Sequence, residues 1–294
     1  MILKYIVKEN KYQSINQILK QKFKISARLQ HKLITSKQIF LNGNQADSRI
    51  APKINNVITV NLDFNEESEN IIPTPIPLNI IYEDEALLIL DKPAGIAVHP
   101  SISHYTDSLA NGVKYYFDTI GLKRKIRPVN RLDLNTSGLI VFAKNEYVQE
   151  CLIQQMQTNE FKKEYLAIVH GVFEKAQGTI NLPIARKENS IIERCISENG
   201  QEAITHYEVL KTSNDLSLVH CTLQTGRTHQ IRVHMSAIGH SLVGDTLYGS
   251  DFSDSITRQA LHSYKISFIH PISHQIFSFT SELPDDIKSS IEAI

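Results

Sequence analysis

The densest group of reactive side chains lies in residues 128–138, Pro-Val-Asn-Arg-Leu-Asp-Leu-Asn-Thr-Ser-Gly. Asp133 and Arg131 stand beside turn-forming residues, directly before an apolar run at 139–143. A loop that leads into a buried strand can present a carboxylate at the edge of a sheet, so Asp133 is a candidate nucleophile or base. The same residue types also form turns with no catalytic role, and spacing alone leaves both interpretations open.

A second group of polar residues spans 223–235, Leu-Gln-Thr-Gly-Arg-Thr-His-Gln-Ile-Arg-Val-His-Met. Gly226 and Arg227 precede a predicted helix that Thr228 could cap, which places free backbone N–H groups beside a guanidinium. This arrangement suits a carboxylate, and it predicts that Arg227 pairs with Asp133. The two histidines of this segment are five residues apart, do not share a helix face and lack further ligands, so no metal site is expected.

A third segment, Phe-Lys-Lys-Glu-Tyr-Leu-Ala-Ile-Val-His-Gly at 161–171, is typical of a strand. Tyr165 then points to the face opposite Leu166. Tyrosines in strands usually pack in the core, so pattern alone does not decide between packing and function.

The composition indicates an ordinary soluble protein. With 294 residues, 41% hydrophobic and 21% charged, the chain is long enough for one large domain and one small domain. It has no apolar run of membrane-spanning length and no signal peptide at its start. Cys151, Cys195 and Cys221 fit no zinc or redox spacing. We therefore expect a cytoplasmic protein with reduced thiols.

The formal net charge of zero conceals a strongly basic beginning. Residues 1–60 contain eleven lysines and arginines against Glu9 and Asp47, a formal charge of +9. Such a segment is typical of a surface that binds nucleic-acid phosphates, although a solvated lysine-rich surface has the same composition.

The basic segment has the pattern of two helices and a β-hairpin. Ser14 and Ser26 can each cap a helix with one apolar face. Asn42-Gly43 between β-prone runs predicts the hairpin turn, and residues 55–64 alternate like a strand. We predict an RNA-binding domain at 1–62. Its candidate RNA contacts are Lys20, Lys22, Arg28 and Lys32.

An acidic and proline-rich stretch at 63–78 is unsuited to a helix or a central strand and is the predicted linker. Residues 79–294 then form the larger domain. Short β-like runs alternate irregularly with helical patterns near 106–119, 146–157, 228–238 and 284–293. This mixture predicts an α+β fold with a mixed, mostly antiparallel sheet.

Taken together, these segments resemble the RluA-type pseudouridine synthase family. The matching stretches, in order, are IIYEDEALLILDKPAGIAVHPS, VNRLDLNTSGLIVFAKN, KKEYLAIVHG, LQTGRTHQIRVHMSAIGHSLVGDTLYG and ALHSYKISFIHP. The first domain likewise resembles the alpha-L RNA-binding module that many of these enzymes carry. Its opening YQSINQILKQ lacks the Arg-Leu-Asp often found there.

The resemblance implies a role for particular residues. Asp133 matches the catalytic aspartate of the family, and Tyr165 matches its active-site tyrosine. Arg227 matches the arginine that pairs with the catalytic aspartate. Arg131 matches a residue that helps to displace the target base in relatives. Leu261 matches a residue that forms an apolar wall of the uracil pocket. Thr136, in the same loop as Asp133, is expected to contact the substrate, and Asn130 replaces a histidine of many relatives.

The resemblance also implies the reaction. An RNA pseudouridine synthase isomerises uridine without gain or loss of atoms, so no cofactor is needed, and the target base is flipped out of the RNA. We expect ribosomal RNA, with the large subunit favoured, as the substrate of a monomer that could act on assembly particles. The alternatives are a tRNA substrate, a non-catalytic RNA-binding or ribosome-assembly protein, and a hydrolase of glycosidic bonds.

Overall fold

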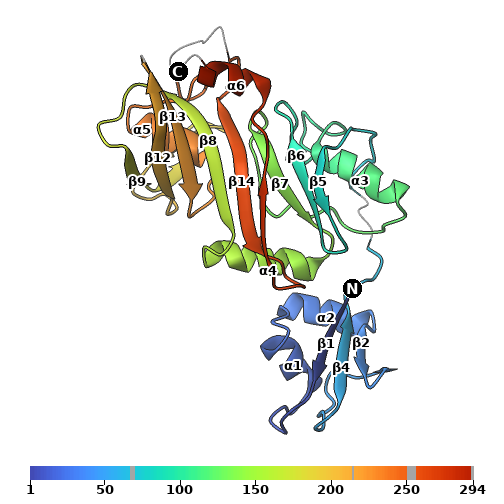
Figure 1. Cartoon of the computed structure of the whole chain (residues 1–294). Helices are drawn as coiled ribbons and strands as arrows, with labels where there is room; N and C mark the ends of the chain where they lie inside the picture. The colour runs from blue at the N-terminus through green and yellow to red at the C-terminus, as the bar shows by residue number, and fades with distance from the viewer. Residues whose placement is uncertain (67–69, 214, 250–255, 293–294) are drawn as a thin grey trace.

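The computed structural model describes residues 1–66, 70–213, 215–249 and 256–292 (Figure 1). A small N-terminal domain lies at one end of a larger domain, next to helix α4 (Figure 1). The larger domain is built on one long sheet, and the chain enters it after strand β4 of the small domain.

The small domain combines two helices with a four-stranded sheet in the order β1-β4-β2-β3. Its elements are β1 (Ile2–Ile6), α1 (Ile15–Gln21), α2 (Ala27–Thr35), β2 (Ile39–Leu41), β3 (Asn44–Gln45) and β4 (Val57–Asn61). Both predicted helices and the hairpin are confirmed. Ser26 Oγ accepts a hydrogen bond from the Leu29 amide at 3.2 Å, and the turn residues Asn42 and Gly43 have φ of 51° and 84°. Strand β1 was not predicted; it pairs with β4.

The small domain contacts helix α4 of the larger domain through ion pairs. Lys32 forms ion pairs with Glu66 and, at 3.2 Å, with Glu146, and Arg28 Nε lies 3.3 Å from Glu146. Glu66 is buried and also accepts two hydrogen bonds from Arg127, at 2.7 and 2.8 Å. The described part of the predicted linker has no helix or strand. Glu66, near its start, contacts Lys32 of the small domain and Arg127 of the larger domain.

The larger domain has a nine-stranded sheet in the order β5-β6-β7-β14-β8-β13-β12-β9, with β15 also paired to β14. Only the β7–β14 pair is parallel among the described strand pairs of this sheet. The α+β class and the mostly antiparallel sheet are therefore confirmed. The strands are β5 (Ile80–Glu83), β6 (Leu87–Lys92), β7 (Ser137–Ala143), β8 (Lys162–His170), β9 (Gln177–Asn181), β12 (Ile204–Ser213), β13 (Leu216–Leu223), β14 (Leu261–Ile269) and β15 (Ile276–Thr280).

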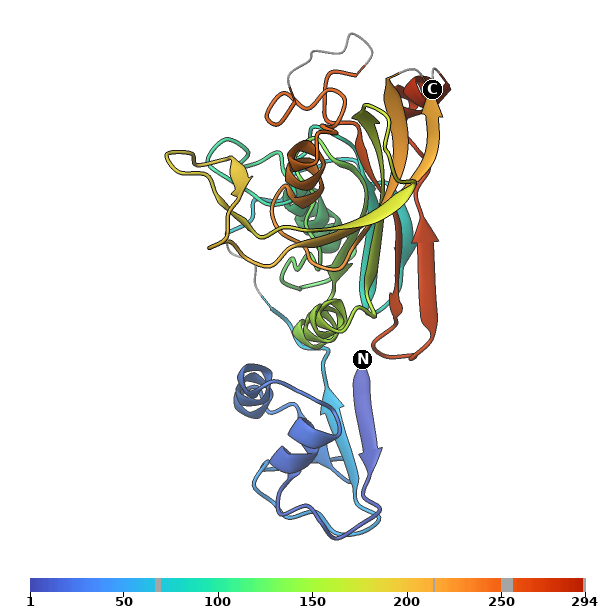
Figure 2. The same cartoon turned by 90° about the vertical axis from the view of Figure 1, so that its left-hand side faces the viewer.

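Helices α3, α4 and α5 lie on one side of this sheet (Figure 2). All four predicted helical segments of the domain are observed. They are α3 (Leu109–Thr119), α4 (Glu146–Gln157), α5 (Gln230–Ala237) and α6 (Asp285–Glu292). A separate two-stranded hairpin, β10 (Ile184–Arg186) and β11 (Arg194–Ile196), was not predicted. Every residue of β7 is buried, so this strand runs through the core and fixes the loop that precedes it.

Gly138, at the start of β7, permits the close parallel approach of β14. Its φ is +106°, and a Cβ added there would lie 2.3 Å from the Ser263 carbonyl oxygen.

Gly138→Ala therefore combines backbone strain with a backbone clash and should lower the free energy of unfolding by about 3 kcal/mol or more. Gly121→Ala is the matched control, because Gly121 has φ of +70° with no atom within 4 Å of its added Cβ, and it should cost about 1 kcal/mol. Urea unfolding measures both; equal losses would contradict the packing role of Gly138.

Candidate active site

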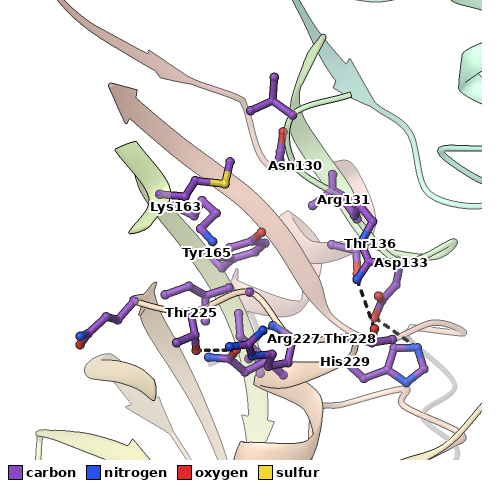
Figure 3. Close-up of a pocket in the computed structure, with 18 of the residues that line it drawn as sticks. Asn130, Arg131, Asp133, Thr136, Lys163, Tyr165, Thr225, Arg227, Thr228 and His229 are labelled. Atoms are coloured by element: carbon purple, nitrogen blue, oxygen red, sulfur yellow. Dashed lines mark hydrogen bonds and ion pairs between the residues drawn. The ribbon is translucent and has the colours of Figure 1, made fainter. Parts of the chain in front are cut away.

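One cavity of about 740 Å³ lies on the helix-covered side of the sheet, and it contains every candidate site residue predicted for the larger domain (Figure 3). Strand β8, strand β14, helix α4, the loop before β7 and the segment before α5 all contribute to its wall. The predicted residues that line it are Asp133, Tyr165, Arg227, Arg131, Thr136 and Leu261. The four basic candidates of the small domain lie outside this cavity.

Asp133 sits on a loop whose backbone is held at several points. The Thr136 amide donates to the Asp133 carbonyl at 3.1 Å and closes a turn. Lys92 Nζ donates to the Leu134 carbonyl at 2.9 Å, and Arg258 donates to the Asn135 carbonyl at 3.0 Å. The Asp133 side chain is 24% exposed, so its carboxylate faces the cavity from a fixed backbone.

Lys92, which the sequence did not single out, is fully buried at the end of β6. Its ammonium donates three hydrogen bonds, to the carbonyls of Pro93, Ile96 and Leu134, at 2.8–2.9 Å. Burial lowers the pKa of Lys92 to about 7, and the negative charge of Asp133 acts in the opposite direction. Three carbonyl acceptors match the three donors of the protonated form, so Lys92 ties the turn after β6 to the Asp133 loop.

The charged partner of Asp133 is Arg232 and not Arg227 as predicted. Arg232 Nη1 donates to Asp133 Oδ2 at 3.1 Å. On its other edge Arg232 binds Asp245 through two hydrogen bonds, at 2.7 and 2.8 Å, and Asp245 is buried. Burial lowers the pKa of Arg232, but the hydrogen bonds and charge of Asp245 and Asp133 outweigh it and raise the pKa overall. The guanidinium therefore stays charged between two carboxylates.

Arg227 does not pair with Asp133 because of where helix α5 begins. Helix α5 begins only at Gln230, after His229 with φ of 57°, so Arg227 lies outside the helix and its side chain turns away. Arg227 Nε donates to the Glu202 carbonyl at 2.9 Å. Arg232, within the first turn of α5, points inward to Asp133. A charged residue among apolar helix positions was the available signal for Arg232.

His229 and Tyr248 complete the surroundings of Asp133. His229 Nε2 lies 3.9 Å from Asp133 Oδ2, and its Nδ1 is hydrogen-bonded to the Tyr248 hydroxyl at 2.8 Å. Burial lowers the pKa of His229, which favours the neutral imidazole. Arg232 also lies 5.0 Å from the centre of the Tyr248 ring. The ionised group nearest to the Asp133 carboxylate among the described residues is therefore Arg232.

Tyr165 and Leu261 form the apolar part of the cavity wall, with exposures of 5% and 4%. Burial raises the pKa of Tyr165, as does the charge of Asp133, so the side chain remains a neutral phenol. Thr136 accepts a hydrogen bond from Gln259 at 3.3 Å, and Arg131 donates to Thr228 at 3.3 Å. The cavity thus combines one carboxylate with a flat ring, an aliphatic wall and an exposed arginine.

Asn130 fixes the other side of the Asp133 loop. Its side-chain oxygen accepts from the Val141 amide at 2.9 Å, and its nitrogen donates to the Leu139 carbonyl at 3.2 Å. The amide is thereby satisfied at both ends, which is consistent with a buried position before β7.

No group of three or more histidine, cysteine, aspartate or glutamate side chains in the described ranges could hold a metal ion. The described helices are also each too short or too polar to cross a membrane.

The fold and the cavity are those of a class of RNA-modifying enzymes. The family model described as RNA pseudouridylate synthase matches residues 86–237. The uncharacterised RNA pseudouridine synthase YjbO of Bacillus subtilis is 39% identical over 252 residues, covering 86% of this chain and 89% of the relative. Ribosomal large subunit pseudouridine synthase D of Nitrosomonas europaea is 41% identical over 227 residues, covering 74% and 66%. The structure of human RNA pseudouridylate synthase domain containing 1 is 26% identical with a TM-score of 0.59, covering 72% and 85%.

The chain belongs to the RNA pseudouridylate synthase family, and within it to the RluA-type enzymes. It is an RNA pseudouridine synthase, an isomerase whose substrate is RNA. The resemblance seen in the sequence is confirmed for the larger domain.

The two arginines of this site should have separable effects. Arg232→Lys keeps one positive charge for the buried Asp245 but cannot bind Asp245 with two hydrogen bonds and reach Asp133 as well, so kcat should fall roughly 100-fold. Arg227→Gln leaves the Asp133 surroundings intact and should act mainly on KM. Steady-state conversion of uridine in an RNA substrate measures both; a larger loss of kcat in Arg227→Gln would contradict the observed pairing.

Proposed function

We propose that this enzyme isomerises uridines in ribosomal RNA of the large subunit, with Asp133 as the group that acts on the sugar. The carrying observation is the open carboxylate of Asp133, held 3.1 Å from Arg232 in a cavity that also presents Tyr165 and Leu261. The RNA class is supported by relatives such as the large-subunit enzyme of Nitrosomonas europaea. tRNA is the alternative substrate to be tested beside it.

The reaction needs an ionised carboxylate and a closed apolar space. The N1–C1′ bond of the target uridine breaks, the uracil turns in the cavity, C5 joins C1′, and the C5 proton is released while N1 takes up a proton. Arg232 holds the Asp133 carboxylate at 3.1 Å, and this carboxylate attacks the sugar or assists removal of a sugar proton. The walls formed by Tyr165 and Leu261 keep the detached base in place while it turns.

Arg131 is proposed to occupy the space that the flipped uridine leaves. Its side chain is exposed at the rim of the cavity and donates a 3.3 Å hydrogen bond to Thr228. An exposed guanidinium of this kind can stack on neighbouring bases and offset part of the unstacking cost of a few kcal/mol.

Asp133→Asn should abolish conversion of uridine to pseudouridine and leave RNA affinity nearly intact. The substitution keeps the shape of the side chain but removes the negative charge on which the reaction depends. Nucleoside analysis after incubation with transcribed ribosomal RNA and with tRNA measures turnover, and filter binding measures affinity. Residual turnover above a few per cent of wild type would sink the assignment of Asp133.

The small domain is proposed to be an alpha-L-like RNA-binding module that acts through the exposed side of α1. Lys20 is exposed, and Lys22 Nζ lies 5.5 Å from the centre of the Tyr5 ring with no carboxylate partner in the described chain. Arg28 and Lys32, also predicted as RNA contacts, instead bind Glu146. Each of them already lies beside a carboxylate of the protein, whereas Lys20 and Lys22 have none among the described residues, so we assign the phosphate contacts first to Lys20 and Lys22.

Replacing both Lys20 and Lys22 by Gln should weaken RNA binding and reduce the slope of log affinity against log salt concentration by about 1.5, because each phosphate contact releases condensed counterions. Arg49→Gln is the control in the same domain, since Asp47 already holds Arg49. Affinity titrations from low to high salt measure the slope. An unchanged slope in the double variant would show that this side of α1 does not meet RNA.

A further inference from the structure

The cavity continues beyond the Asp133 part of the site toward the end of helix α4. Figure 3 shows Lys163 and Asp133 on opposite sides of Tyr165. Beyond Lys163 the cavity wall consists of the last turns of α4 and the segment that follows it. The side chains it presents are Ile153, Met156, Gln157 and Asn159.

The size of the cavity exceeds what one uridine requires. Pockets of about 300–1,000 Å³ enclose whole drug-sized molecules, and one nucleotide is at the small end of that range. A volume of about 740 Å³ therefore leaves room beside a uridine placed between Asp133, Tyr165 and Leu261.

Lys163 is a buried cation for which the described residues supply no counterion. Its residue exposure is 7%, and no hydrogen bond or ion pair reaches its ammonium from any described residue. The other two buried lysines are satisfied: Lys92 by three carbonyls, and Lys144 by Glu83 and the Asp84 carbonyl. An unpaired buried charge is costly, so the exception at Lys163 points to a ligand that brings a negative charge.

A second cation stands next to Lys163. Gly226, the residue before Arg227, lies so close to Lys163 that a Cβ added to Gly226 would be 3.0 Å from Lys163 Nζ, and the charge of Arg227 acts on Lys163. Burial and this like charge lower the pKa of Lys163 to about 8. Arg227 itself uses Nε for the Glu202 carbonyl and has no acidic partner among the residues described. Two adjacent cations on one cavity wall form a suitable place for a phosphate.

The wall next to α4 has the chemistry that recognises an unpaired base. Ile153 is 40% exposed, and with Met156 it offers an apolar surface for a base face. Gln157 and Asn159 are exposed amides, which can donate to and accept from base edges. Recognition of single-stranded RNA combines contacts of both kinds with a phosphate contact.

We propose that the α4 end of this cavity binds the nucleotide adjacent to the target uridine, with its base on Ile153 and Met156 and the phosphate that joins the two nucleotides at Lys163 and Arg227. The inference rests on the proposed function, because it takes the target uridine to lie at Asp133. It gives this part of the enzyme a role in choosing which uridines are modified.

The test compares wild type with Lys163→Met, Lys163→Arg and Lys162→Met on transcribed ribosomal RNA, with kcat and KM measured between pH 7 and pH 9. Lys162 is the control, because it is an exposed lysine on the opposite face of the same strand. Lys163→Met should raise KM about tenfold at pH 7, with little change in kcat, because one charge-assisted phosphate contact is lost. Lys162→Met should resemble wild type.

The pH dependence separates a phosphate contact from a structural role. In wild type KM should rise between pH 7 and pH 9 as the Lys163 ammonium loses its proton. Lys163→Arg stays protonated and should keep a low, flat KM, whereas Lys163→Met should show a high, flat one. A KM for Lys163→Met equal to that of wild type, or a rise with pH that survives in it, would overturn the phosphate contact even though the wild type modifies RNA.

The base contact is tested by mapping modified sites in the same RNA with Asn159→Ala and Met156→Ala. Both variants should modify uridines with a wider range of neighbouring bases than wild type does. Identical neighbours in all three proteins would overturn the second-nucleotide site. Absence of pseudouridine with the wild type on every RNA offered would instead contradict the proposed function, so the two failures are distinguishable.

Discussion

The active site depends on one guanidinium that is shared by two carboxylates. Asp245 is buried and binds Arg232 with two hydrogen bonds, which leaves a single Arg232 nitrogen directed at Asp133. A buried arginine is stable here because it is charged, hydrogen-bonded and neutralised on both sides. The Asp133 carboxylate is thereby held beside Arg232 and faces the cavity that Tyr165 and Leu261 also line. Helix α5 carries this arginine in its first turn.

The second constraint is the fixed backbone of the loop that carries Asp133. Lys92 and Arg258 bind two successive carbonyls of the loop, at Leu134 and Asn135, and Asn130 ties its other end to β7. These contacts come from strand β6, from the segment before β14 and from the loop itself, so the sheet order brings them together. A carboxylate on so fixed a loop loses little freedom when substrate binds, which favours precise attack.

Local pattern alone predicted the loop of Asp133 as a candidate site, whereas the places of Tyr165 and Leu261 in the site were predicted from the family resemblance. Asp133, Tyr165 and Leu261 line one cavity as expected, and the helix and strand periodicities hold because each face is buried or exposed regularly. Arg232 and Lys92 were missed because their roles come from contacts distant in sequence. For the same reason the pairing of Lys32 with Glu146, which joins the two domains, could not be predicted from a local pattern.

Tritium release from RNA labelled at C5 of uridine tests the central claim most directly, because formation of the new C5–C1′ bond must expel that hydrogen. The purified full chain is offered unmodified large-subunit ribosomal RNA and tRNA in parallel, and free uracil is measured in the same samples. We predict release of tritium from the ribosomal RNA without free uracil. Free uracil that still carries the tritium, or no tritium from either RNA, would contradict an isomerase that forms the C5–C1′ bond; Asp133→Asn in the same assay should release no tritium.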